Sequence, residues 1–188
     1  MSQTTTSTSL TGLQGTYTLD PSHSRIGFVA RHAMIAKVRG AFNEVSGTAT
    51  IDGANPSASS LEVTIQTASV DTRDANRDGH LASPDFFDVA TYPTITFVGT
   101  GFEITDAETV AVTGDLTIKG VTHPVTIPFE FGGVAVDPFG NSRVGFEGQV
   151  VVNRKDWGLT WNAALETGGV LVSEKVTLEF EVSAIKAA

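Results

Sequence analysis

The stretch Arg73–Val89, RDANRDGHLASPDFFDV, lies between long runs of alternating apolar and polar residues, and is where the chain leaves those runs. Pro84 has no backbone N–H and restricts the residue before it, so a helix in this stretch must end just before Pro84. Phe86 and Phe87 are costly to leave in water, and they therefore draw the segment back onto a core. We predict a short helical segment near residues 74–82, followed by a return to the rest of the fold.

The flanking runs predict β-strands, each with one apolar and one polar face. In the clearest of them, Val176, Leu178, Phe180 and Val182 alternate with threonine and glutamate. Such two-faced strands form antiparallel sheets with one solvated side. About eight of them can close into a barrel, which removes the sheet edges and leaves a lumen for side chains or one small ligand. We therefore predict an all-β fold in which residues 16–188 form one antiparallel, closed barrel rather than a two-sheet sandwich.

The sequence also predicts the character of several segments outside these strands. Residues 1–15 are rich in serine and threonine and offer little to bury, which predicts a flexible N-terminal tail. Residues 32–37 (HAMIAK) are predicted to form a short helical turn. The N-terminus has neither the basic nor the apolar region of a signal peptide, and this predicts a cytoplasmic protein. No apolar run approaches the ~20 residues that a transmembrane helix needs.

Composition narrows the classes of function. The net charge is −9, with no cluster of lysine or arginine along the chain, which argues against nucleic acid and against binding an anionic membrane by charge alone. There is no cysteine, so disulfides, zinc–thiolate sites and cysteine nucleophiles are excluded. We expect no cofactor and no metal, and a homodimer is compatible with these features.

Two patterns leave a metal-dependent alternative open. Residues at the spacing of an EF-hand calcium loop are Asp74, Asn76, Asp78, Gly79 and Asp85. The usual bidentate glutamate is absent and Pro84 disturbs the end of the loop, so a solvated turn is the favoured interpretation. The histidines lack the usual metal-ligand spacings. The alternative function is a small metal-dependent enzyme or module that uses His23, His32, His80 and Asp78.

Several motifs together resemble the YceI-like family. The strongest is Arg77–Ser83 (RDGHLAS) followed by Asp85–Asp88 (DFFD). In chain order, the others are Tyr17–Asp20, His23–Ser24, Gly40–Phe42, Val70–Thr72, Tyr92–Pro93, Gly114–Thr122 (GDLTIKGVT) and Arg154–Gly158 (RKDWG). The resemblance covers nearly the whole chain from Tyr17. It implies a lipocalin-like barrel that binds a long apolar molecule, in known members a polyisoprenoid, without catalysis and without metal.

The resemblance and the strand pattern together predict a carrier or sequestering protein for a long-chain isoprenoid or similar lipid. A long chain suits a dry tube, because each buried CH₂ contributes ~0.8 kcal/mol without a directional contact. The predicted lining residues are Ile26, Phe28, Phe86, Phe87, Val112, Leu116, Ile127, Phe129, Phe146 and Phe180. Arg77 and His80 are predicted to lie near the polar head of the ligand. A barrel filled by its own side chains, acting through its surface, is a further alternative.

Overall fold

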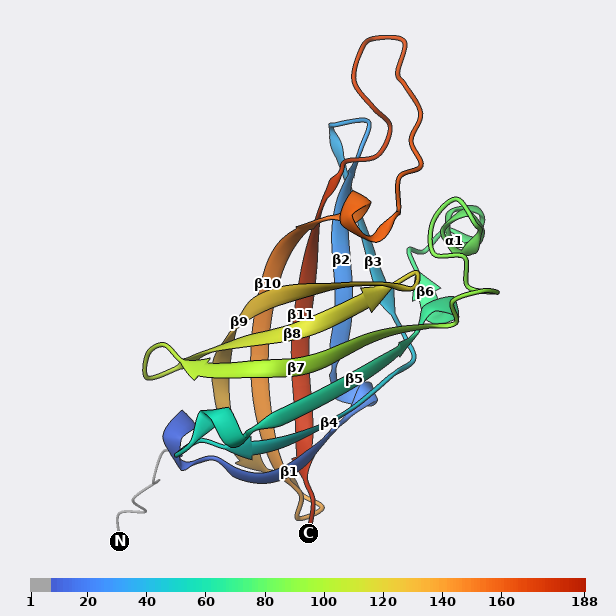
Figure 1. The fold of residues 1–188 in the computed structure, drawn as a ribbon. Helices are drawn as coiled ribbons and strands as arrows, with labels where there is room; N and C mark the ends of the chain where they lie inside the picture. The colour runs from blue at the N-terminus through green and yellow to red at the C-terminus, as the bar shows by residue number, and fades with distance from the viewer. Residues whose placement is uncertain (1–7) are drawn as a thin grey trace, which may run out of the picture.

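The computed structural model describes residues 8–188, and their main feature is a closed antiparallel barrel of eight strands (Figure 1). The barrel strands, in the order in which they pair, are β1 (Gln14–Leu19), β4 (Val45–Asp52), β5 (Ser60–Gln66), β7 (Thr94–Ile104), β8 (Thr109–Ile118), β9 (Val121–Val136), β10 (Ser142–Asn153) and β11 (Lys175–Lys186). Pairing of β1 with β11 closes the ring. The predicted fold class is therefore confirmed.

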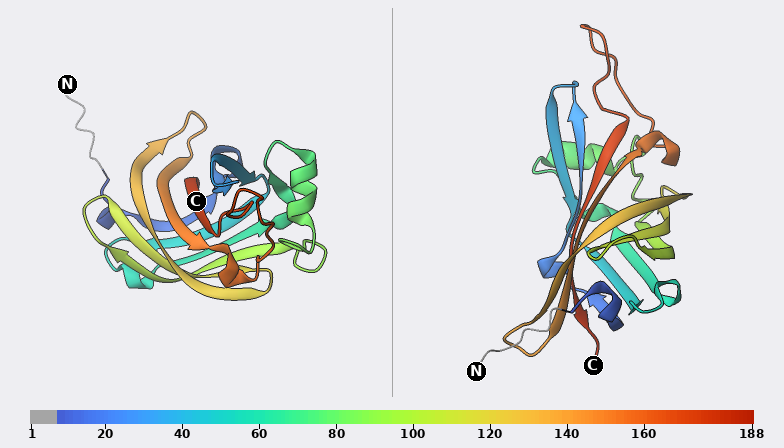
Figure 2. Two further views of the ribbon diagram at one scale, coloured as in Figure 1. Left: turned by 90° about the horizontal axis from the view of Figure 1, so that it is seen from above. Right: turned by 90° about the vertical axis from the view of Figure 1, so that its left-hand side faces the viewer.

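One edge of β11 pairs with two different strands along its length, so the two ends of the barrel differ in structure. Residues 177–181 pair with β2 (Arg25–His32), whereas residues 184–186 pair with β1. Between β1 and β2 the chain makes one turn of 3₁₀-helix, Pro21–His23, whose start is capped by the Asp20 side chain. The barrel is consequently closed at the β1 end. At the other end β2 and its partner β3 (Ala36–Phe42) form a hairpin that projects beyond the other strands (Figures 1 and 2).

The stretch 73–89 follows a short strand that pairs with the end of β3, outside the ring of eight barrel strands. This strand is β6 (Val70–Asp71), which leads through residues 72–74 into helix α1 (Ala75–Ala82) (Figure 1). The Asp74 side chain caps α1 by accepting from the backbone N–H of Arg77, and the helix ends at Ala82, two residues before Pro84. The predicted helix is therefore present, and Phe86 is buried in the core behind it.

Two local predictions are wrong. Part of the predicted tail, residues 10–15, belongs to the fold: Leu10 and Leu13 are buried against Tyr17, and β1 begins at Gln14. Residues 1–7 of that tail lie outside the described part of the chain. The predicted helical turn at 32–37 is the tip of the β2–β3 hairpin. In both places long-range pairing outweighs the local sequence preference.

The turn at the closed end is held by Arg143, which bridges two aspartates. Its Nη1 lies 2.6 Å from Oδ2 of Asp20, and its Nε lies 2.7 Å from Oδ2 of Asp137 on the β9–β10 hairpin. These hydrogen bonds hold the pKa of both carboxyl groups well below their usual value of 3.8. Carboxylates with lowered pKa values stabilise the folded state above their usual pKa, and they lose this contribution as the pH falls further.

We expect Arg143→Met to lower the melting temperature at pH 7, and to lower it progressively less as the pH falls below the usual aspartate pKa of 3.8. The cluster contributes fully above the usual pKa of the two aspartates, and this contribution is lost as the pH falls through their lowered pKa values in the folded protein. Thermal melts of both proteins across that range measure the effect. Lys155→Met is the control, because Lys155 and Glu174 form an exposed pair that contributes little. A difference that stays constant with pH would contradict the assigned role of the cluster.

Candidate ligand-binding cavity

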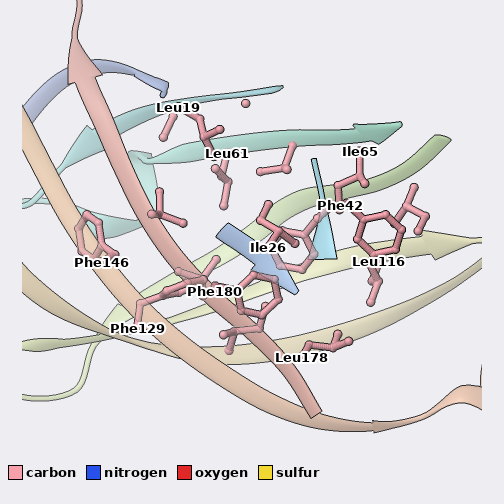
Figure 3. A pocket seen from close by; sticks show the side chains of 18 of the residues that line it. Leu19, Ile26, Phe42, Leu61, Ile65, Leu116, Phe129, Phe146, Leu178 and Phe180 are labelled. Carbon is pink, nitrogen blue, oxygen red and sulfur yellow. The ribbon is translucent and has the colours of Figure 1, made fainter. Parts of the chain in front are cut away.

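The barrel encloses a cavity of about 300 Å³ whose lining is almost entirely apolar (Figure 3). It extends from Leu10 and Leu13 at the closed end to Val172 and Leu159 near the projecting hairpin. Pockets of roughly 300–1,000 Å³ are typical of small-molecule sites, and apolar cavities tend to stay dry. The interior is therefore suited to an apolar ligand.

All ten predicted apolar residues line this cavity. They come from β2, β8, β9, β10 and β11, where alternate residues face inward, and from the segment that follows α1. Figure 3 shows Ile26, Leu116, Phe129, Phe146 and Phe180 directed into the same space. The strand pattern predicted this placement, and the role of these residues in binding is part of the function proposed below.

Phenylalanine rings lie over glycines of neighbouring strands, which helps to keep the interior hollow. Phe28 is paired directly with Gly40, and a Cβ on Gly40 would come within 2.3 Å of the Phe28 ring. Phe129 is paired with Gly148 in the same way, with a corresponding approach of 2.8 Å. The rings therefore occupy space along the wall that a larger partner residue would fill. Which glycine lies opposite which phenylalanine depends on the strand register, so the alternation of apolar and polar residues could not predict this feature of the lumen.

Arg77 and His80, predicted near the polar head of a ligand, do not line the cavity. Arg77 donates from Nε to Oγ1 of Thr72 (2.8 Å) and from Nη2 to the carbonyl oxygen of Thr72 (2.7 Å). Asp78 accepts from both the backbone N–H and the hydroxyl of the same threonine, which is buried. These contacts tie α1 to the end of β6, so the charged residues of this motif hold the helix in place.

His80 joins the α1 segment to the loop that follows β10. Its ring packs edge-on against Trp161 with centroids 4.6 Å apart, and Phe86 lies 5.1 Å away on the same segment as His80. Its Nε2 is 2.9 Å from Oδ2 of Asp85. Trp161 also contacts Phe86, at a centroid distance of 5.5 Å. The end of the barrel near the projecting hairpin is thus covered by two segments in mutual contact, rather than by a strand ladder.

Arg154 is the functional candidate that the sequence did not single out. Although it lines the cavity, it is only 6% exposed, and its guanidinium donates to the carbonyl oxygens of Leu159, Val172 and Ser173. Among residues 8–188 it has no carboxylate within 4.0 Å, and burial lowers its pKa. It also stands 6.0 Å from the centre of the Phe86 ring. Arg154 therefore fixes both ends of the covering loop and places a positive charge at this end of the cavity.

The residues of the metal-dependent alternative do not meet. His23 contacts Asp20 (2.8 Å), His80 contacts Asp85, and His32 lies at the end of β2. No group of three histidine, aspartate or glutamate side chains within residues 8–188 is arranged to hold a metal ion. Asp74, the first residue of the calcium-like pattern, caps α1 instead. This alternative therefore has no convergent site in the described chain.

Across residues 8–188, none of the helices has the length and apolar character required to cross a membrane.

Comparisons with known proteins agree with this geometry. The family model of the YceI-like domain matches residues 17–184. A UPF0312 protein of Pseudomonas savastanoi is 42% identical over 137 residues, which cover 73% of this chain and 71% of that protein. One from Pseudomonas putida is 37% identical over 164 residues, covering 87% and 82%.

Solved structures share the fold. The Campylobacter jejuni YceI protein superposes with a TM-score of 0.72 and 33% identity, covering 84% of this chain and 90% of that one. BcnA of Burkholderia cenocepacia gives a TM-score of 0.77 at 27% identity, covering 88% and 98%. A polyisoprenoid binding domain from Saccharophagus degradans gives 0.71 at 19% identity, covering 91% and 98%. The family match over most of the chain, together with these relatives, shows that the chain belongs to the YceI-like family.

Proposed function

We propose that this protein binds one long apolar lipid of the polyisoprenoid type inside the barrel, as a carrier or sequestering protein. The observation that carries the proposal is the apolar cavity that runs through the barrel. Each methylene buried there contributes about 0.8 kcal/mol without a directional contact, so a long chain can bind tightly in an otherwise featureless tube. The polyisoprenoid-binding domain that shares this fold supports the same class of ligand.

The two ends of the cavity suggest how the ligand lies. At the closed end the lining includes Leu10 and Leu13, which suits a hydrocarbon tail. At the covered end lies the guanidinium of Arg154, which suits the polar end of a lipid. The ligand would then enter tail-first past the α1 segment and the loop held by Arg154. An apolar lining favours binding over catalysis, and we propose no reaction.

Mass spectrometry of what the protein carries tests this function. The purified protein is extracted with organic solvent, and the extract is compared with that of a control protein purified in the same way. We expect one lipid with a long isoprenoid or similar chain, at close to one molecule per protein. The extracted protein, refolded without lipid, is then titrated with a long-chain prenol. No lipid in the extract and no saturable binding of the prenol would contradict the proposal.

A further inference from the structure

The tip of the β2–β3 hairpin combines strained backbone with exposed apolar side chains. Ala33 and Met34 adopt positive φ angles of 50° and 64°, in the left-handed region that non-glycine residues seldom occupy. Met34 is 55% exposed and Ile35 is 83% exposed. Strained backbone and exposed apolar side chains both lower the stability of the folded protein. Where they occur together they are typical of binding sites.

Positive charges surround this tip. Arg31 and Lys37 are direct cross-strand partners, a like-charge arrangement that destabilises a sheet. Neither forms an ion pair with any residue of the described chain, while Arg39 shares Glu179 with Arg25. The stretch 31–42 (RHAMIAKVRGAF) contains no acidic residue, although the protein as a whole carries a net charge of −9. The hairpin is therefore a local basic region on an acidic protein.

The tip is physically continuous with the covered end of the cavity. Phe28 and Ala30 of β2 line the cavity, and β2 ends two residues after Ala30, at the turn that carries Met34. The backbone N–H of Ala33 donates to the carbonyl oxygen of Leu171 (2.7 Å) in the covering loop. His32 forms a bridge with Val172, which also lines the cavity. Figures 1 and 2 show the hairpin and this loop side by side above the barrel, with the loop extending farther than the hairpin tip.

We propose that this hairpin tip docks the protein on a lipid bilayer that contains anionic lipids. Met34 and Ile35 insert among the headgroups, and Arg31 and Lys37 lie against the lipid phosphates. Docking at this point places the covered end of the cavity at the membrane surface. A role of docking in lipid exchange with the membrane rests on the function proposed above. Binding of the hairpin tip to a bilayer can be measured without any ligand in the cavity.

A membrane fits this surface better than a protein partner. A stable protein interface buries roughly 800 Å² on each partner, and a narrow hairpin with two apolar side chains at its tip offers little such area. A bilayer needs only a small apolar tip with cations beside it. The net negative charge of the protein opposes general adsorption to an anionic membrane, so binding should be confined to this end and should weaken with salt.

Sedimentation with vesicles tests the proposal. The vesicles contain either phosphatidylcholine alone or phosphatidylcholine with phosphatidylglycerol. The wild-type protein should bind the second kind and show little binding to the first. Each cation near an anionic surface strengthens binding about fivefold, so Arg31→Gln combined with Lys37→Gln should weaken it about 30-fold. Ile35→Asp should weaken it about tenfold or more, because the tip no longer enters the headgroup region.

The control is Phe139→Asp, which alters an 89% exposed apolar residue on the β9–β10 hairpin at the opposite end of the barrel. It should leave vesicle binding unchanged, and no variant should have a lower melting temperature or a lower lipid content than the wild type. Absence of wild-type binding to the anionic vesicles would overturn the proposal. So would an equal loss in Phe139→Asp. If the charge variant loses binding while Ile35→Asp keeps it, the protein adsorbs by charge alone and the proposed insertion of the hairpin tip is wrong.

Discussion

Val112→Trp is expected to remove the bound lipid while the protein stays folded. Val112 is a buried residue of β8 that lines the cavity, opposite Phe102 on β7 and Ile127 on β9. In a barrel filled by its own side chains, the larger residue would cost roughly 1–3 kcal/mol or more of stability. Beside a cavity of about 300 Å³, the indole has space that the ligand otherwise occupies.

Two measurements on the same samples decide between these cases: the lipid extracted per protein, and urea melts of the lipid-free forms. We expect the variant to lose most of its lipid, while its unfolding free energy changes by less than about 1 kcal/mol. The control is Thr113→Trp, because Thr113 is the next residue of β8, faces away from the cavity and bonds Thr126. Lipid content should be normal in the control. Normal lipid together with a large loss of stability in Val112→Trp would indicate a solid core at this position.

Leu10→Ala and Leu13→Ala are expected to destabilise the protein by about 2–5 kcal/mol each. Both side chains are buried with Tyr17, Val144 and Ala184 at the closed end of the barrel. The backbone crosses close to β4 here, because the N–H of Gly53 donates to the carbonyl oxygen of Leu13 (2.7 Å). Truncating either leucine leaves a cavity that this hydrogen-bonded backbone cannot collapse to fill.

Urea unfolding measures both losses, and Thr11→Ala is the matched control. Thr11 lies between the two leucines and is exposed, so its substitution should change the unfolding free energy by no more than about 0.5 kcal/mol. The lipid content of Leu13→Ala should also fall, because Leu13 lines the closed end of the cavity. Equal stability of all three variants and the wild type would mean that residues 10–13 behave as the predicted tail.

Periodic features of the chain were sufficient to predict the barrel and the direction of its lining side chains. Alternation of apolar and polar residues is local information, since it fixes which side chains share a face before any strand has a partner. This is why Val112, Leu116, Ile127 and Phe129 all face the interior as predicted. Pro84 and Asp74 are also local signals, and they set the end and the start of α1.

Other features depend on contacts between residues far apart in sequence, and only the tertiary structure decided them. Leu10 and Leu13 stand in a polar stretch, yet Val144 and Ala184 provide the apolar surface that buries them.

The contacts of the polar residues also depended on the path of the folded chain, even where the partners are close in sequence. Arg77 was predicted to lie near the polar head of a ligand. In the structure its guanidinium instead donates hydrogen bonds to Thr72. Arg154 is held at the end of the cavity by hydrogen bonds to the carbonyl oxygens of Leu159 and Ser173, and the sequence does not reveal these partners. Arg31 and Lys37 are six positions apart and become neighbours because the chain reverses at Met34. Burial, strand pairing and the clustering of charges all depend on which residues are close together in space. The sequence determines these distances only through the folded structure.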